Sequence, residues 1–126
     1  MMSEGAPRRT MADGNAIPLL GLGTWPLDDD GAHAVVADAL RAGYRLVDTA
    51  TNYGNERGVG RAVREAEIPR EELFVTTKLP GAQHGHREAL AGLDESLDRL
   101  GLEYVDLYLI HWPLPMVGKY VDTWRA

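Results

Sequence analysis

Four short apolar segments alternate along the chain with stretches in which apolar residues recur at helical spacing. The apolar segments cover residues 19–25, 44–48, 73–78 and 104–110 of the 126 residues. Strands that are apolar along nearly their whole length typically pair in parallel, and a right-handed crossover helix joins each strand to the next. The alternation therefore predicts an α/β fold made of repeated strand–helix units.

Turn and capping residues delimit these elements. An Asp-Gly turn at residues 13–14 predicts an N-terminal β-hairpin within residues 10–17. Residues 28–30 (DDD) supply an N-cap for the first helix, and Gly43 ends it. The second helix follows residues 52–55 and stops before a proline.

The third helix follows a Gly- and His-rich loop at residues 80–86, which we expect to be flexible. Its leucines recur at helical spacing, and we expect them to lie in the core: Leu90, Leu93, Leu97 and Leu100. Gly101 closes this helix. Asp122 is the expected N-cap of a fourth helix, which runs to the end of the sequence at Ala126.

Two parallel architectures fit this order of elements. A doubly wound sheet would carry a glycine-rich phosphate loop after its first strand, but residues 21–26 (GLGTWP) have proline where the third glycine belongs. A (β/α)₈ barrel needs roughly 250 residues, so a chain of 126 residues could supply about half of one. We therefore expect residues 1–126 to form one domain, the first four β/α units of a TIM barrel preceded by the hairpin.

Polar residues stand at the ends of the apolar segments or just after them, where the strands are expected to end. Because chemistry gathers at the carboxyl ends of parallel strands, we expect these residues to share one site. The four residues are Asp48, Tyr53, Lys78 and His111.

These side chains can deliver a proton to a carbonyl group. An ammonium at Lys78 stabilises the phenolate form of Tyr53 and makes its hydroxyl proton easier to release. Asp48 keeps Lys78 charged, and His111 donates a hydrogen bond that orients the carbonyl oxygen. None of these groups donates two electrons, so a reduction requires a hydride from a bound nicotinamide.

Other interpretations compete with this one. Each residue alone is more often structural, and Lys78 could instead form a Schiff base in an aldolase-like lyase. Trp25 and Trp112 could be ordinary core residues. His84 and His86 lack a third ligand nearby, and residues 28–30 lack the spacing of a calcium loop, so we predict no metal site.

Composition excludes several classes of partner. A net charge of −6, with basic residues dispersed along the chain, argues against nucleic acid and membrane surfaces. The absence of cysteine excludes disulfides and a thiol nucleophile. Residues 1–9 lack the apolar region of a secretory signal, so we expect a cytoplasmic protein.

Five ordered motifs give the chain a resemblance to the aldo-keto reductases. The motifs are residues 21–25 (GLGTW), 42–50 (AGYRLVDTA), 53–56 (YGNE), 73–79 (LFVTTKL) and 100–113 (LGLEYVDLYLIHWP). Within that family the chain looks most like the prokaryotic reductases similar to 2,5-diketo-D-gluconate reductase.

The resemblance implies an NADPH-dependent barrel enzyme that reduces aldehydes and ketones, with Tyr53 as the proton donor. It places Asp48, Lys78 and His111 at the other catalytic positions. It also assigns Gly23, Thr24, Trp25 and Asp48 to the cofactor, and Trp25, Tyr53, His111 and Trp112 to the carbonyl substrate.

By the same resemblance, the chain is the amino-terminal half of such a barrel, and the site for the 2′-phosphate of NADPH lies beyond residue 126. We therefore expect weak NADPH binding and impaired activity. Whole family members are expected to be monomers. Open strand edges would instead let this chain self-associate as a non-catalytic interaction module.

Overall fold

The computed structural model describes residues 6–126 and contains two sheets. The smaller sheet is an antiparallel hairpin of β1 (Arg8–Thr10) and β2 (Ala16–Pro18). The larger sheet has four parallel strands in chain order, β3 (Gly21–Gly23), β4 (Leu46–Asp48), β5 (Phe74–Leu79) and β6 (Leu107–Ile110). The parallel α/β fold and the hairpin are thus confirmed. Residues 1–5, which hold part of the segment expected to lack a secretory signal, lie outside the described residues.

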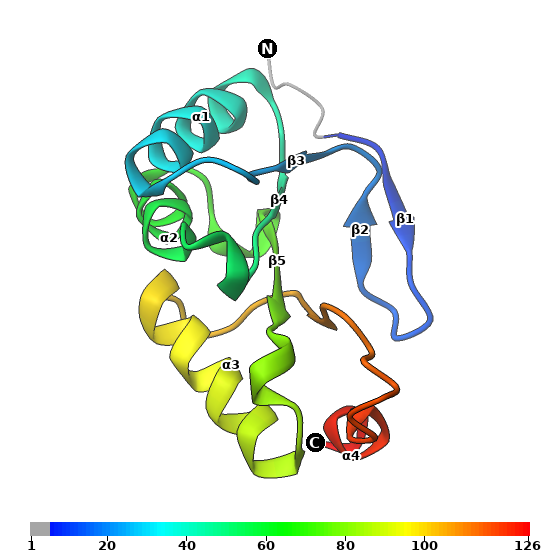
Figure 1. The fold of residues 1–126 in the computed structure, drawn as a ribbon. Coiled ribbons are helices and arrows are strands. Elements are labelled where there is room, and N and C mark those ends of the chain that lie inside the picture. The colour runs from blue at the N-terminus through cyan, green and yellow to red at the C-terminus, as the bar shows by residue number, and fades with distance from the viewer. Residues whose placement is uncertain (1–5) are drawn as a thin grey trace.

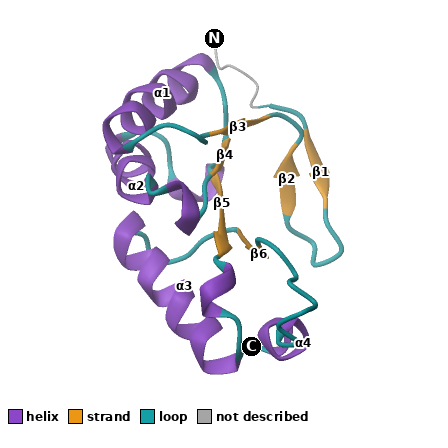
Figure 2. Ribbon diagram, in the orientation of Figure 1, coloured by secondary structure: helices purple, strands orange, loops and turns teal. Residues whose placement is uncertain are grey.

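The first three helices connect the parallel strands and cover one face of the sheet (Figure 1). They are α1 (Asp29–Ala42), α2 (Glu56–Glu65) and α3 (His86–Leu100), followed after β6 by the short α4 (Tyr120–Arg125). Three 3₁₀ turns lie in the connections, η1 (Thr51–Tyr53), η2 (Arg70–Glu72) and η3 (Gly81–Gln83) (Figure 2). The strand order does not reverse, as in a barrel and unlike a doubly wound sheet.

The core lies between this helix layer and the sheet. Its fully buried members are mostly β-branched or aliphatic, and they include Val36, Val47, Val59, Val75 and Leu100. None of the helices within residues 6–126 combines the length and apolar character that crossing a membrane requires.

The predicted caps of α1 are confirmed. Asp28 Oδ1 accepts a hydrogen bond of 2.8 Å from the amide of Gly31, which satisfies one of the free donors at the helix start. Gly43 ends the helix with φ of 110°, a left-handed conformation that side chains disfavour.

Two glycines let α2 approach both neighbouring helices very closely. A Cβ atom at Gly58 would overlap the carbonyl of Asp29 at the start of α1. A Cβ atom at Gly60 would overlap the carbonyl of Leu100 at the end of α3. The backbone of α2 is therefore packed directly against both helices, and neither position accepts a larger residue without a shift of the backbone.

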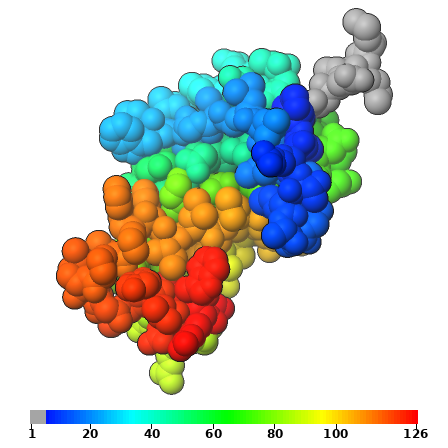
Figure 3. All heavy atoms as spheres, turned by 90° about the vertical axis from the view of Figure 1, so that its right-hand side faces the viewer, coloured from blue at the N-terminus to red at the C-terminus, as the bar shows by residue number. Residues whose placement is uncertain are grey.

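The hairpin lies near the amino-terminal ends of the strands. Arg8 Nη2 donates a hydrogen bond of 2.6 Å to the carbonyl of Glu72, just before β5. Figure 3 looks onto the side opposite α1, α2 and α3, where the hairpin (blue) lies at one end and the segment after β6 (orange to red) at the other. The carboxyl ends of the strands are left uncovered by the hairpin.

Several expectations were wrong in detail. The strands are shorter than the apolar segments, and β3 covers only three residues. Asp122 lies inside α4, which is preceded by Lys119 as its cap. The loop before α3, whose flexibility stays a prediction, includes the 3₁₀ turn η3 and the buried His84.

The predicted leucine core of α3 is confirmed at Leu100 and wrong at Leu90, whereas Leu93 and Leu97 are half-buried. Only Leu100 is fully buried, whereas Leu90 is 47% exposed. The buried face of α3 is formed mainly by small residues, Ala89, Gly92 and Ser96, together with Leu100. The small residues face the crowded side of the helix, because a Cβ atom at Gly92 would overlap the side chain of Leu79 on β5.

Replacing Leu100 with alanine is expected to lower the free energy of unfolding by about 2–5 kcal/mol, since it opens a cavity in the core. Replacing the exposed Leu90 on the same helix is expected to lower it by less than about 1 kcal/mol. Urea unfolding followed by circular dichroism measures both. Equal losses for the two variants would contradict the buried face described for α3.

Candidate active site

The ammonium group of Lys78 lies at the centre of the polar residues that follow the strands. Its Nζ donates hydrogen bonds of 2.8 Å to both carboxylate oxygens of Asp48, at the end of β4. It also donates to the carbonyl of Thr49 at 3.0 Å and to the hydroxyl oxygen of Tyr53 at 3.3 Å. The Lys78 side chain is largely buried, which strengthens its pairing with Asp48.

Tyr53 and His111 face each other beside this ion pair. The Tyr53 ring comes from the 3₁₀ turn η1, and Lys78 Nζ lies 4.9 Å from its centroid. The His111 ring follows β6 and meets the Tyr53 ring edge to face, with centroids 5.7 Å apart. Asp48, Tyr53, Lys78 and His111, which we call the four-residue cluster, therefore converge at the carboxyl ends of the strands, as the sequence predicted.

Hydrogen-bond direction determines what Tyr53 can do. The ammonium of Lys78 can only donate, so the Tyr53 oxygen accepts from it. The hydroxyl hydrogen of Tyr53 then remains available for another acceptor. A cation close to the phenol oxygen also favours the negative charge that follows proton release. The arrangement is suited to giving a proton to an electron-rich oxygen.

The electrostatic environment lowers the pKa of His111 from its ordinary value of 6.5. Burial is the largest cause, and the positive charge of Lys78 acts in the same direction, while Asp48 opposes both. His111 is thus neutral at pH 7, with a ring N–H that can donate a hydrogen bond.

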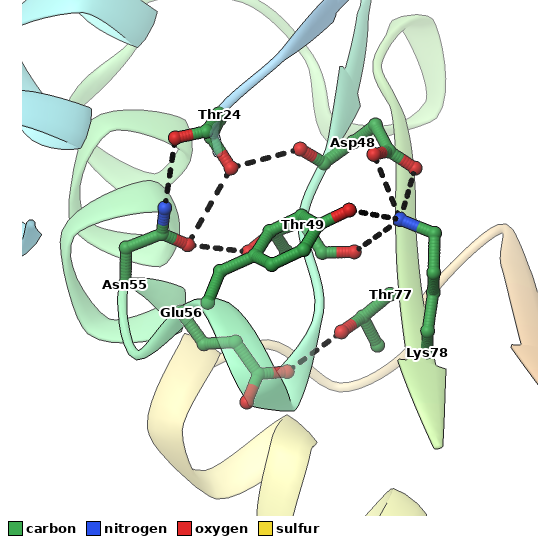
Figure 4. A network of polar contacts seen from close by, with 8 residues as sticks. Thr24, Asp48, Thr49, Asn55, Glu56, Thr77 and Lys78 are labelled. Atoms are coloured by element: carbon green, nitrogen blue, oxygen red, sulfur yellow. Dashed lines mark hydrogen bonds and ion pairs between the residues drawn. The ribbon is translucent and has the colours of Figure 1, made fainter. Parts of the chain in front are cut away.

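A layer of buried polar side chains supports the cluster from behind (Figure 4). Asn55 Oδ1 accepts a hydrogen bond from the hydroxyl of Thr49 at 2.6 Å and lies 3.4 Å from the hydroxyl oxygen of Thr24. Its amide donates to the carbonyls of Thr24 and Leu27. Thr24 in turn donates to the carbonyl of Asp48 at 2.9 Å. Together these bonds connect residues 48–49 and the start of α2 to the segment that follows β3.

The sequence interpretation gave no role to several residues of this layer. Asn55 and Glu56 were recognised only as part of a motif, and Thr49, Thr77 and Arg99 were not singled out. A usable signal existed, because threonines at 76–77 interrupt an otherwise apolar strand and an uncompensated polar residue is costly in a core. Most of their hydrogen-bond partners lie far away in the sequence, as between Glu56 and Thr77 or Arg99.

The residues assigned to a cofactor or substrate lie around the same end of the sheet. Gly23 ends β3 directly opposite Asp48, and no atom lies within 4 Å of where its Cβ would be. Trp25 is 69% exposed and Trp112 is 62% exposed, so neither is the core residue that the alternative interpretation required. Trp112 stacks on His111, with ring planes 3° apart. Thr24 differs, since its side chain is fully buried and bonded inward.

Residues 6–126 contain no group of three or more His, Asp or Glu side chains placed to hold a metal ion. His84 is buried, while His86 is exposed at the first position of α3.

Residues 19–126 match the family model described as the Aldo/keto reductase family. An aldo-keto reductase of Mycobacterium ulcerans is 54% identical over 121 residues, 96% of this chain and 43% of that protein. One of Mycobacterium tuberculosis is 55% identical over 119 residues, 94% of this chain and 42% of the relative. The chain thus spans less than half the length of these curated relatives.

Solved structures of this family have the same fold. An aldo/keto reductase from Brucella melitensis superposes with a TM-score of 0.94 and 48% identity, covering 100% of this chain and 48% of the other. A Bombyx mori aldo-keto reductase in complex with NADP gives a TM-score of 0.88 and 40% identity, covering 98% of this chain and 46% of the other.

In a titration followed by NMR of the histidine rings, His111 is expected to have a midpoint below 6.5. Lys78→Met is expected to raise this midpoint, because a like charge is removed. The unfolded chain binds this proton more readily, so His111 contributes to stability above pH 6.5 and that contribution falls as the pH decreases toward the lower folded value. Arg41→Gln, which removes an exposed charge on α1, is the control and should leave the midpoint unchanged. A wild-type midpoint at or above 6.5 would contradict the environment described.

Proposed function

The chain belongs to the aldo/keto reductase family, a family of oxidoreductases, and from this premise we propose that it reduces an aldehyde or ketone to the alcohol with NADPH. Tyr53 is the proton donor in this proposal. The other members of the four-residue cluster make that proton transfer possible. Because the chain spans less than half of its relatives, the activity of the whole enzyme is part of the proposal.

The observation that carries the proposal is the bond of 3.3 Å from Lys78 Nζ to the Tyr53 oxygen, made by an ammonium that Asp48 holds with two bonds of 2.8 Å. Asp48 keeps Lys78 charged. Lys78 in turn stabilises the negative charge left on Tyr53 when its proton moves to the carbonyl oxygen. The neutral His111 ring, 5.7 Å from that of Tyr53, donates a hydrogen bond that orients the carbonyl.

The residues around Asp48 fit a nicotinamide. Gly23 leaves open space beside Asp48, and the exposed indole of Trp25 lies two residues further on. We propose that Gly23, Trp25 and Asp48 contact the nicotinamide end of the cofactor, and that Thr24 supports them from below through the Asp48 carbonyl. When bound, the reduced nicotinamide supplies the hydride that the carbonyl carbon requires.

The reaction balances with one proton and one hydride. The hydride adds to the carbonyl carbon, and the Tyr53 proton adds to the oxygen, which yields an alcohol. Tyr53 is left as a phenolate beside Lys78 and regains a proton from solvent. Trp25 and Trp112 present exposed indole rings beside the cluster, and we propose that they form the apolar walls of the substrate site.

Two alternatives have less support. Lys78 would have to lose its proton to act as a Schiff-base nucleophile, whereas both oxygens of Asp48 and two further acceptors favour its charged form. Self-association through the outer strands β3 and β6 of the described sheet stays a prediction, which light scattering tests.

We expect the purified chain, supplied with millimolar NADPH and a small aldehyde, to form the alcohol as NADPH absorbance decreases. Tyr53→Phe should lower the rate about 100-fold or more, because only the donor proton is lost. Fluorescence titration of NADPH is expected to give weak binding, above the micromolar range, that is equal for the two proteins.

The matched control is Tyr104→Phe, which removes a partly exposed hydroxyl distant from the cluster and should not change the rate. Full turnover by Tyr53→Phe would refute Tyr53 as the donor. A stable adduct on Lys78 after treatment with carbonyl substrate and borohydride would instead favour the Schiff-base alternative. Binding of NADPH at micromolar concentration would overturn the expectation of weak binding.

A further inference from the structure

Glu56 is a buried carboxylate that the proposed reaction does not use. Its side chain is 1% exposed, although it is the first residue of α2. Burying a charge without partners is costly, so both carboxylate oxygens are engaged. Oε1 accepts a bond of 2.8 Å from Arg99 Nε on α3, and Oε2 accepts one of 2.7 Å from the Thr77 hydroxyl on β5.

The partners of Glu56 lead to two members of the four-residue cluster. Thr77 directly precedes Lys78 on β5. Arg99 Nη2 donates to Thr51 at 3.2 Å, and Thr51 begins the 3₁₀ turn that ends at Tyr53. Glu56 therefore bonds to the strand that carries Lys78 and, through Arg99, to the turn that carries Tyr53.

The hydrogen bond from Lys78 to Tyr53, which these contacts support, tolerates little movement. A bond of 3.3 Å between Lys78 Nζ and the Tyr53 oxygen is at the long end of the normal range, so a small movement of either segment would break it. The field of Glu56 also extends through this part of the interior. Burial, and after it the charge of Glu56, raises the pKa of Tyr108 on β6.

We infer that Glu56, acting with Arg99, is a positioning residue that holds Tyr53 against Lys78. The inference rests on the proposed function for its catalytic consequence, since it concerns the geometry of the proposed proton donor. In physical terms, the buried carboxylate joins β5, the Tyr53 turn and α3 at one point. Loss of its charge releases the turn from the strand while the ion pair of Lys78 and Asp48 remains.

A second ion pair, between Arg70 in η2 and Asp106 just before β6, provides a matched control. Arg70 donates to Asp106 at 2.8 Å near the amino-terminal ends of β5 and β6, and the Arg70 guanidinium lies 4.1 Å from the Tyr104 ring centroid. The Asp106 carboxylate accepts one hydrogen bond from the Arg70 guanidinium and one from the amide of Val75. Asp106→Asn therefore removes a carboxylate with one charged and one neutral donor, as Glu56→Gln does. It does so at the opposite end of the strands from the cluster.

The first test uses 3-fluorotyrosine and ¹⁹F NMR, with the Tyr53 resonance assigned by its loss in Tyr53→Phe. Glu56→Gln is expected to move the Tyr53 resonance toward its position in Lys78→Met, because the Lys78 contact is lost in both. Asp106→Asn is expected to move the Tyr104 resonance and leave that of Tyr53 in place. An unchanged Tyr53 resonance in Glu56→Gln, or an equal change in Asp106→Asn, would overturn the inference.

The second test is kinetic. Glu56→Gln is expected to lower kcat by about tenfold or more with KM values for NADPH and aldehyde changed less than about twofold, since only the alignment of the proton donor is affected. Asp106→Asn should retain the kcat of the wild type. If the wild-type chain itself shows no NADPH-dependent reduction, the proposed function fails, and the fluorine experiment still decides the positioning role.

Thr77 keeps the inference testable if Glu56→Gln does not fold. Thr77→Val removes the hydroxyl bonded to Glu56, and Thr77→Ser keeps it. A displaced Tyr53 resonance in Thr77→Val that is restored in Thr77→Ser supports the positioning role. Identical Tyr53 resonances in the two variants would count against it.

Discussion

The ion pair between Lys78 and Asp48 depends on the register of two neighbouring strands. Asp48 on β4 lies opposite Thr76 on β5, and Lys78 lies two residues beyond Thr76 on the same side of its strand. A slip of one residue would turn Lys78 toward the helix layer and leave its charge without Asp48. The register of β4 with β5 therefore determines whether Lys78 reaches Asp48. Tyr53 and His111 are arranged around that ion pair.

Successive side chains along β5 point to opposite faces of the sheet and contact different groups. Lys78 points to the cluster, whereas its neighbour Thr77 points to the helix layer and bonds to Glu56. The strand thus connects the chemistry on one side with a buried charge on the other. Asn55 and Glu56, adjacent at the start of α2, anchor the Tyr53 turn to different strands, Asn55 toward β3 and β4 and Glu56 toward β5.

Local sequence signals predicted where the helices and strands lie better than they predicted which residues pack around those elements. Asp28 and Gly43 act through their own backbone neighbours, so a sequence pattern is enough to place them. The exposed side of α3 could not be inferred from leucine spacing, because the small residues Ala89, Gly92 and Ser96 pack against neighbouring elements. The four-residue cluster could be predicted from the sequence because strand ends meet in any parallel sheet. The support from Asn55, Glu56 and Arg99 could not be predicted, because it depends on partners from distant segments.

The placement of α1, α2 and α3 on one face has a consequence for the shape of the sheet (Figure 1). Neighbouring strands lie about 4.8 Å apart, whereas packed helices need about 8–10 Å. With one helix for each strand, the helix layer is wider than the strand layer beneath it. Each helix can stay beside its own strands only if the sheet bends, with the helices on its convex side. The concave side then draws the strand ends toward a common axis, so the convergence of the four polar groups is favoured by a mismatch of widths between two layers.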